Sequence, residues 1–276
     1  MSAIDRSAVP SIQLEGVSFA YPDGTRALES VNLRIEPGEL VAIVGQNGSG
    51  KSTLVRHLVG LLRPTVGRVL LDGADVRRVH VARLAARVGL AFQNPDRQLF
   101  AGRVADEMPF GPRNLGVRGA EVEERVRAAL EAVGLGGEAE MNPYDLGYSR
   151  RKLLAIASVL AMRTPVLILD EPTTGQDARG VARVRGVVEA AAAEGRTVVA
   201  ISHDMRFAAE CFRRVVAMRE GRVVLDGAPG EVFAEGRWPE LRASYLEPPL
   251  PALVGARLGL GPTPTGAALV AALRGA

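Results

Sequence analysis

The chain has 276 residues, of which 47% are hydrophobic, 24% charged and 4% aromatic, and its formal net charge at pH 7 is +3. This composition is typical of a globular protein and excludes a disordered, collagen-like or disulfide-stapled chain, since Cys211 is the sole cysteine. The best candidate for a membrane span, Leu153 to Met162, ends at Arg163, short of the roughly 18 apolar residues required. We therefore expect a cytoplasmic chain that has no signal peptide and does not cross a membrane by itself.

The basic residues are almost all arginine, and the only lysines are Lys51 and Lys152. Arginine pairs such as Arg77-Arg78 are interleaved with acidic residues and lack the aromatic side chains on which nucleic-acid bases stack. We expect no nucleic-acid partner, whereas contact with an anionic membrane surface stays open. Because the chain otherwise uses arginine, each lysine raises the question of which function an arginine could not perform at that position.

Short apolar runs bounded by Gly, Pro or Asp predict strands in two stretches of the chain. The first stretch has them at residues 12–19, 31–35, 40–44, 68–71 and 88–91, and the second at 166–169, 197–201, 215–218 and 223–225. Longer segments rich in Ala, Arg and Glu, such as residues 178–194, separate the strands of the second stretch and predict helices. Strands that alternate with helices indicate an α/β fold with a parallel sheet covered on both faces.

Between the two stretches the strand signal disappears, and residues 121–133 and 149–162 have helical patterns instead. We therefore predict a helical subdomain at about residues 94–164, inserted into a core domain of residues 11–228. Residues 1–10 form an N-terminal tail. A Pro-rich stretch near residues 247–251, followed by two short apolar stretches, marks a C-terminal extension at residues 229–276.

The strongest motif has the form G-x-x-x-x-G-K-[ST] and lies between the strand predicted at 40–44 and a helical stretch at 54–61. In this context, consecutive backbone N–H groups wrap a phosphate at a helix N-terminus. The lysine adds a slim point charge that the broad fork of an arginine would not replace, and the next hydroxyl is a ligand for Mg²⁺. The residues predicted to bind nucleotide here are Gly45, Asn47, Gly48, Ser49, Gly50, Lys51, Ser52 and Thr53.

The strand predicted at 166–169 ends in two adjacent carboxylates, Asp170 and Glu171. Because side chains alternate along a strand, the two point in different directions and can serve different roles. We expect Asp170 to hold the Mg²⁺ shell together with Ser52, and Glu171 to orient the attacking water and accept its proton. On its own, an acidic strand end would be interpreted as an ordinary turn. Together with the phosphate loop, it predicts a catalytic site.

The order of motifs over about residues 11–228 resembles that of the nucleotide-binding subunit of an ATP-binding cassette (ABC) transporter. After the phosphate loop come Gln93 at a strand end, a helical insertion, the segment Leu146 to Arg150, LDEPTTGQD at 169–177 and ISHD at 201–204. The resemblance implies a P-loop ATPase that uses ATP and Mg²⁺. It also implies that Tyr21 stacks on adenine and that Gln93 senses Mg²⁺ and water. In that family Asp177 would link two subunits and His203 would contact the γ-phosphate; plain packing of Tyr21 and a turn role for His203 are the alternatives.

Residues 93–100 (QNPDRQLF) and 110–116 (FGPRNLG) are similar to the ATPases of energy-coupling factor (ECF) importers, which take up vitamins or nickel and cobalt ions. In that group the segment faces the membrane scaffold, which implies a coupling surface of Gln98, Leu99 and Phe100. Ordinary core packing of Leu99 and Phe100 is the alternative. The C-terminal extension resembles the element that helps to pair two ATPases in the same group. The implied partners are a second ATPase, a transmembrane scaffold and a membrane-embedded substrate-binding subunit.

The chain departs from the ABC family at the signature motif: where the family has Leu-Ser-Gly-Gly-Gln, this chain has Leu146-Gly147-Tyr148-Ser149-Arg150. That motif presents a hydroxyl and bare glycine backbone to the nucleotide held by the opposite subunit, at the start of a helix. Tyr148 puts a bulky side chain where the backbone must approach closely, while Ser149 is a candidate cap for the helix. Two copies of this chain would place Tyr148 in both shared sites, so we predict a heterodimer.

The sequence thus predicts the ATP-hydrolysing motor subunit of an ECF-type importer, bound at the cytoplasmic face of the membrane. An ATPase of another importer type, for amino acids or peptides, is a rival against which residues 93–116 argue. A soluble ABC ATPase is a second rival, but the length leaves no room for a second cassette or a long coiled coil. A small-molecule P-loop kinase would not explain the pair of Asp170 and Glu171 together with His203. The sequence is silent on the transported substrate.

Overall fold

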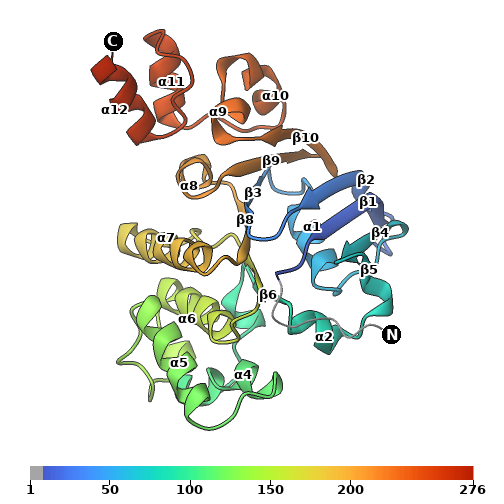
Figure 1. Cartoon of the computed structure of the whole chain (residues 1–276), viewed down its shortest axis with the longest axis vertical. Coiled ribbons are helices and arrows are strands. Elements are labelled where there is room, and N and C mark those ends of the chain that lie inside the picture. Colours follow the sequence, from blue (N-terminus) through green and yellow to red (C-terminus); the bar gives the residue numbers. More distant parts are fainter. Residues whose placement is uncertain (1–8, 276) are drawn as a thin grey trace.

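The computed structural model describes residues 9–275 and contains two β-sheets flanked by helices (Figure 1). The larger sheet has six strands in the order β10-β9-β3-β8-β7-β6. Five of them are parallel, and β10 pairs antiparallel with β9. Their bounds are β3 Leu40–Val44, β6 Val88–Ala91, β7 Val166–Asp170, β8 Thr197–Ser202, β9 Arg214–Arg219 and β10 Arg222–Gly227. The predicted α/β class, with parallel strands between helices, is confirmed.

The smaller sheet has the order β2-β1-β4-β5 and is antiparallel throughout. Its strands are β1 Ile12–Ala20, β2 Arg26–Ile35, β4 Val66–Leu71 and β5 Ala74–Asp75. The alternation of strands and helices did not predict a separate sheet. The antiparallel pairing follows from the short connection between the first two strands. Only residues 21–25 join β1 to β2, which is enough for a hairpin but too short for a parallel crossover.

The central strand β3 is buried along its whole length and divides the core into two clusters. Val41 and Ile43 pack with residues of α1 (Lys51–Leu58) and of the antiparallel sheet. Ala42 and Val44 belong to the cluster formed with α6 (Tyr148–Leu160), α7 (Ala178–Ala193) and α8 (Met205–Cys211). This alternation follows from the two-residue period of a strand and explains why β3 reads as a continuous apolar run.

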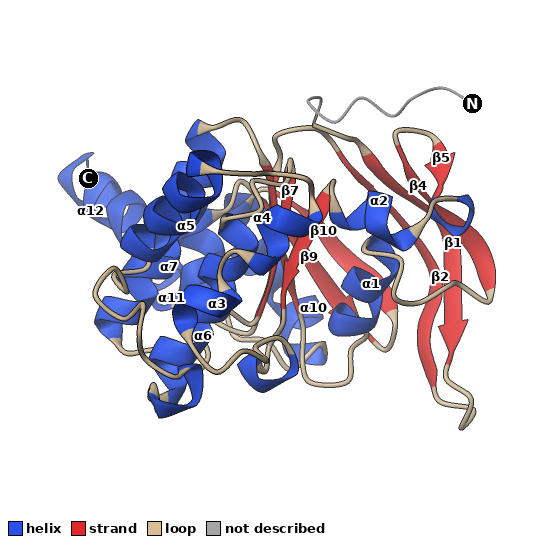
Figure 2. Ribbon diagram, turned by 90° about the horizontal axis from the view of Figure 1, so that it is seen from below, coloured by secondary structure: helices blue, strands red, loops and turns tan. Residues whose placement is uncertain are grey.

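The segment between β6 and β7 is helical, as predicted, and lies at one end of the molecule, whereas the C-terminal helices lie at the other end (Figure 1). Figure 2 shows most helices gathered on one side of the six-stranded sheet and β1, β2, β4 and β5 on the other. The remaining elements are η1 Val76–Arg78, α2 Val81–Ala85, η2 Pro95–Arg97, α3 Val104–Glu107, α4 Phe110–Asn114, α5 Ala120–Ala132, η3 Pro143–Asp145, α9 Pro229–Val232, η4 Glu235–Arg237, α10 Trp238–Ala243, α11 Leu250–Arg257 and α12 Gly266–Gly275.

Across residues 9–275, none of the helices combines the length and the apolar character that a bilayer crossing requires. The predicted N-terminal tail lies outside the described residues except for Val9 and Pro10. The parallel register brings the carboxyl ends of three neighbouring strands to one edge of the sheet. Val44 pairs with Ser202 across β3 and β8, and Asp170 pairs with Ile201 across β7 and β8. Loops that follow these strands can therefore meet in one site.

Candidate active site

The phosphate loop joins the end of β3 to the start of α1 and depends on glycine at two positions. Gly50 precedes the helix with φ of 101°, a backbone conformation that other residues rarely adopt. A Cβ atom on Gly50 would lie 2.5 Å from the Ala27 carbonyl oxygen, and one on Gly45 would lie 2.5 Å from the Met218 carbonyl oxygen. The close approach of neighbouring backbone thus excludes any side chain at either position.

Lys51 spans this loop. Its Nζ donates hydrogen bonds to the carbonyl oxygens of Gly45, at 2.7 Å, and of Gln46, at 2.8 Å. The side chain is buried, and this burial lowers the pKa of the ammonium, an effect that the negative charges of Glu171 and Asp170 oppose. The cation is therefore held at the loop and directed toward the two carboxylates.

A cavity of about 290 Å³ opens beside the loop and is lined by residues from four parts of the chain, among them Tyr21, Lys51, Ser52, Gln93 and Glu171. A Cβ atom on Gly48 would meet nothing within 4 Å, so the loop faces open space there. Backbone N–H groups at the start of a helix, one ammonium and an open cradle fit a phosphate chain. No residue of the segment 146–150 lines this cavity.

The structure supplies a pair of hard oxygen donors next to the loop. The Ser52 hydroxyl lies 3.4 Å from Asp170 Oδ1. Burial and the charge of Glu171 raise the pKa of Asp170, while the hydrogen bond from Ser52 lowers it. Residues 9–275 contain no cluster of three or more His, Cys, Asp or Glu side chains that would hold a metal by themselves. This donor set fits Mg²⁺, which takes one or two protein oxygens and completes its shell with water and substrate phosphates.

Glu171 follows β7 and is buried with a positive φ of 52°. Its Oε2 accepts a hydrogen bond from Thr174 Oγ1 at 3.2 Å and contacts His203 Nδ1 at 2.7 Å. The His203 side chain, at the end of β8, is 59% exposed and contacts the carboxylate with one ring nitrogen. The sequence prediction that these two residues belong to one site agrees with their contact, although nothing in the sequence indicated that Thr174 joins them.

Tyr21 and Gln93 both line the cavity but differ in how they are held. The Tyr21 hydroxyl lies 3.0 Å from Thr53 Oγ1, and its ring packs edge-on against Phe19 with centroids 5.0 Å apart. Gln93 has an exposed side chain, and its carbonyl oxygen lies 3.5 Å from the Tyr148 hydroxyl. The predicted adenine and Mg²⁺ roles of these residues stay predictions.

In the segment Leu146 to Arg150, Leu146 is buried and Tyr148 is 42% exposed at the start of α6. The prediction that Ser149 caps this helix is wrong, because Gly147 occupies the N-cap position and makes no side-chain cap. The Ser149 hydroxyl instead donates to Gln176 Oε1 at 2.7 Å. Arg150 forms an ion pair with Glu138.

Asp177 lies at the N-cap of α7, where its Oδ1 accepts a hydrogen bond from the Gly180 N–H at 2.7 Å. The carboxylate is exposed. Its predicted role in joining two subunits stays a prediction, and capping is the role it has within this chain.

Two of the three predicted coupling residues point inward. Leu99 is buried, and the Gln98 side chain bonds to Ala155 O at 2.6 Å and to the Phe92 N–H at 3.0 Å. Phe100 is 60% exposed and packs edge-on against Phe110, with ring centroids 4.8 Å apart. An exposed surface here therefore consists of Phe100 and Phe110, and the predicted surface of Gln98 and Leu99 is corrected, because both are occupied inside the fold.

A phosphate loop between a parallel strand and a helix, with an acidic strand end two strands away, defines a P-loop nucleotide-binding fold. The family described as ABC transporter matches residues 28–174 of the chain. The solved structure of cbiO1 from Clostridium perfringens, part of the ABC transporter complex cbiONQ, is similar with a TM-score of 0.74 and 35% identity, covering 91% of this chain and 99% of that one.

Two curated relatives are similar over most of their length. The energy-coupling factor transporter ATP-binding protein EcfA of Methanothermobacter thermautotrophicus is 41% identical over 226 residues, which cover 81% of this chain and 73% of that protein. EcfA2 of Symbiobacterium thermophilum is 46% identical over 245 residues, which cover 86% of this chain and 84% of that protein. In contrast, the chain spans only 40% of a relative from Methanosarcina acetivorans that is 42% identical. The chain belongs to the ABC transporter family of ATPases.

Proposed function

We propose that the chain is the ATP-hydrolysing motor subunit of an ECF-type importer at the cytoplasmic face of the membrane. It would drive uptake of a vitamin or a transition-metal ion through a membrane scaffold partner. The observation that carries this proposal is one open cavity lined by Lys51, Ser52 and Glu171. Asp170 lies beside the Ser52 hydroxyl, and His203 contacts the Glu171 carboxylate. The similarity to EcfA, EcfA2 and cbiO1 supports the importer type.

In this proposal the loop N–H groups and the Lys51 ammonium bind the β- and γ-phosphates of ATP. Mg²⁺, held by Ser52, Gln93 and Asp170, would neutralise the charge that develops on the phosphates during transfer. Glu171 orients the attacking water and accepts its proton, because its Oε2 is held by Thr174 and His203. His203 contacts the γ-phosphate with the other side of its ring, and Tyr21 stacks on the adenine.

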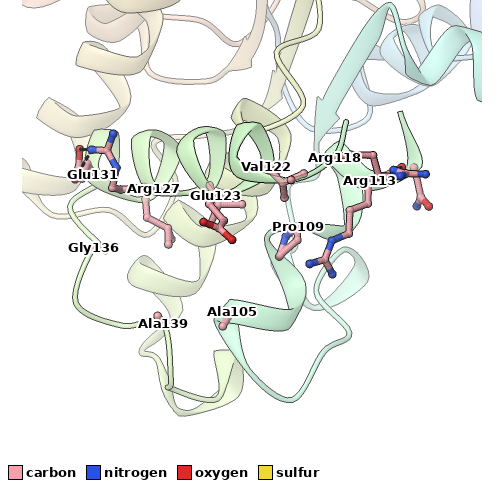
Figure 3. A pocket seen from close by; sticks show the side chains of 14 residues that line it. Ala105, Pro109, Arg113, Arg118, Val122, Glu123, Arg127, Glu131, Gly136 and Ala139 are labelled. Carbon is pink, nitrogen blue, oxygen red and sulfur yellow. Dashed lines mark hydrogen bonds and ion pairs between the residues drawn. The ribbon is translucent and has the colours of Figure 1, made fainter. Parts of the chain in front are cut away.

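A groove on the helical segment is the proposed contact for the membrane scaffold (Figure 3). A cavity of about 850 Å³ lies between α3, α4 and α5, and its lining is mixed (Figure 3). It includes the apolar Val122 and Val126, the cations Arg113, Arg118 and Arg127, and the carboxylates Glu123 and Glu131. It adjoins the exposed pair of Phe100 and Phe110 through α4. An apolar helix of the scaffold that carries an acidic residue facing Arg113 and Arg118 would fit this lining, since Glu131 is already paired with Arg127.

The variant Val126→Glu tests this groove. Val126 is half-buried in the groove, so a carboxylate there would have to be desolvated on docking, and we expect the membrane scaffold to be lost from the purified complex. The matched control Val81→Glu, at an exposed position on α2, should retain the scaffold. Equal recovery of the scaffold with both variants, measured by mass spectrometry of the complex, would exclude the groove as the docking site.

The heterodimer prediction rests on Tyr148. If each site combines one chain's phosphate loop with the other chain's signature, a copy of this chain offers a complete phosphate loop and a poor signature. Absence of residues 146–150 from the lining of the cavity is consistent with a site shared between chains. A second, different ATPase with an intact signature would then complete the site formed by Lys51 and Glu171.

A mixing experiment with this chain alone tests the shared site. The variant Gly147→Ser, Tyr148→Gly, Ser149→Gly restores the hydroxyl and the two bare glycines of the signature and leaves Arg150 in place. Glu171→Gln added to it disables its own site. We expect wild type and this four-substitution variant each to hydrolyse ATP slowly, and an equimolar mixture to be at least about 10-fold faster, since one composite site becomes complete. Full activity of the wild-type chain alone, or no gain on mixing, would argue against the heterodimer.

A further inference from the structure

Lys152 is the second of the two lysines in the chain and has no role in the proposed function. It lies on the first turns of α6 and is only 1% exposed. Its Nζ donates a hydrogen bond to the Thr174 carbonyl oxygen at 3.0 Å and lies 5.9 Å from the centre of the Tyr148 ring. A buried ammonium is costly to desolvate, so a cation at this position calls for an explanation.

The start of α6 holds the segment that follows β7 by three contacts. Lys152 bonds to Thr174, as above, and Tyr148 packs so closely that a Cβ atom on Gly175 would lie 2.8 Å from its ring. Ser149 and Gln176 exchange two hydrogen bonds, of 2.7 and 3.0 Å. Residues 174–176 are therefore anchored to α6 by their side chains and carbonyl groups, in addition to the backbone hydrogen bonds from Thr174 to Glu171 and from Gln176 to Thr173 within the turn after β7.

Thr174 transmits this position to the catalytic carboxylate. Its backbone carbonyl accepts the hydrogen bond of Lys152, and its hydroxyl donates to Glu171 Oε2, the same oxygen that contacts His203 Nδ1. The contacts form one continuous path from the Lys152 ammonium through Thr174 and Glu171 to His203. We propose that Lys152 is a positioning residue for Glu171, acting through Thr174; this inference rests on the proposed function of Glu171 as the base.

The electrostatics of the site agree with this geometry. Burial lowers the pKa of Lys152 to about 8, and the negative charges of Glu171 and Asp170 oppose that shift. Both lysines of the chain thus face the same two carboxylates, Lys51 from the phosphate loop and Lys152 from α6. The slim lysine stem reaches the Thr174 carbonyl from a side chain that is only 1% exposed, and the planar guanidinium of an arginine is wider than this ammonium.

Steady-state kinetics of the assembled ATPase test the positioning role. Lys152→Met keeps the apolar stem and removes the ammonium, and we expect kcat to fall on the order of 10-fold while KM for ATP stays within about 2-fold, because a displaced base lowers turnover without weakening nucleotide binding. Thr174→Val removes only the hydroxyl that holds Glu171 and should have a similar effect. The double variant should be no slower than the slower single variant, since both act on one path.

The matched control is Arg68→Met, which removes an exposed cation that pairs with Glu15 on the antiparallel sheet; it should leave kcat unchanged. An unchanged kcat in Lys152→Met, a loss that lies entirely in KM, or fully additive effects in the double variant would overturn the proposal.

A readout that needs no activity separates this inference from the proposed function. The chain has three histidines, and substitution of His203 assigns its imidazole NMR signals in the full chain. Lys152→Met and Thr174→Val should both shift the His203 signals and leave the signals of the exposed His80 unchanged. Arg68→Met should shift the signals of neither histidine. Unshifted His203 signals in Lys152→Met would refute the path. If the wild type hydrolyses no ATP in any assembly, the proposed function fails. The NMR measurement still tests whether Lys152 is linked to His203 through Thr174 and Glu171.

Discussion

The variant Glu171→Gln should bind ATP as tightly as the wild type and hydrolyse it about 10² to 10⁴ times more slowly. The amide matches the carboxylate in size but cannot accept the proton of the attacking water. The hydrogen bond from Thr174 to the side-chain oxygen can persist, so the fold around the end of β7 should be retained. Phosphate release and nucleotide affinity, measured on the same preparation, separate turnover from binding.

A suitable control for Glu171→Gln is Glu194→Gln, which removes an exposed carboxylate beyond the end of α7. Its turnover should equal that of the wild type. Retention of more than about a tenth of wild-type turnover by Glu171→Gln would remove Glu171 from the role of base, because general bases contribute at least about 10²-fold.

The variant Lys51→Met should lose nearly all affinity for ATP. Two cations, Arg26 and Lys51, are among the described residues that line the cavity, and Lys51 is the one that belongs to the phosphate loop. A methionine there supplies no charge or N–H donor. We expect the dissociation constant for ATP to rise by at least about 10²-fold, which corresponds to roughly 2.7 kcal/mol. Isothermal titration of the purified chain with ATP measures this directly.

Lys51→Met also removes the donor to the carbonyl oxygens of Gly45 and Gln46, so thermal unfolding must be recorded beside the titration. The control Arg68→Met loses a cation of the same sign at an exposed position and should bind ATP normally. Near-wild-type affinity in a folded Lys51→Met variant would show that the nucleotide is bound elsewhere.

The parts of the site that were predictable are those whose chemistry is local in the sequence. The loop from Gly45 to Lys51 carries its own strand and helix, so its conformation follows from a few adjacent residues. Asp170 and Glu171 end a strand that is apolar throughout, and the parallel register then brings them to the edge where β3 ends. For these residues, sequence spacing and topology are sufficient.

The parts that were missed depend on contacts between distant segments. Gln98 looks like a surface residue in QNPDRQLF, yet its amide bonds to α6, 57 and 60 residues further along the chain. Ser149 resembles a helix cap but finds Gln176 as its partner. The single signal that pointed to Lys152 was its rarity as a lysine, and its link to Thr174 became visible only with the packing of α6 against residues 174–176.

The antiparallel sheet shows the same limit in the fold. Apolar runs at 12–19 and 31–35 predicted strands correctly, but their partners could not be read from hydrophobicity alone. The short helix α3 also escaped, because four residues carry too little periodicity to be recognised.

Mass spectrometry of the proteins that co-purify with the tagged chain from detergent-solubilised native membranes tests the importer assignment most directly. The account predicts three partners: a membrane scaffold with many spans, a second ABC ATPase with an intact Leu-Ser-Gly-Gly-Gln signature, and a small membrane-embedded substrate-binding protein whose identity would give the substrate class. Recovery of the chain alone, or with a partner from outside the membrane, would contradict the importer assignment and favour an ABC ATPase that does not act in transport.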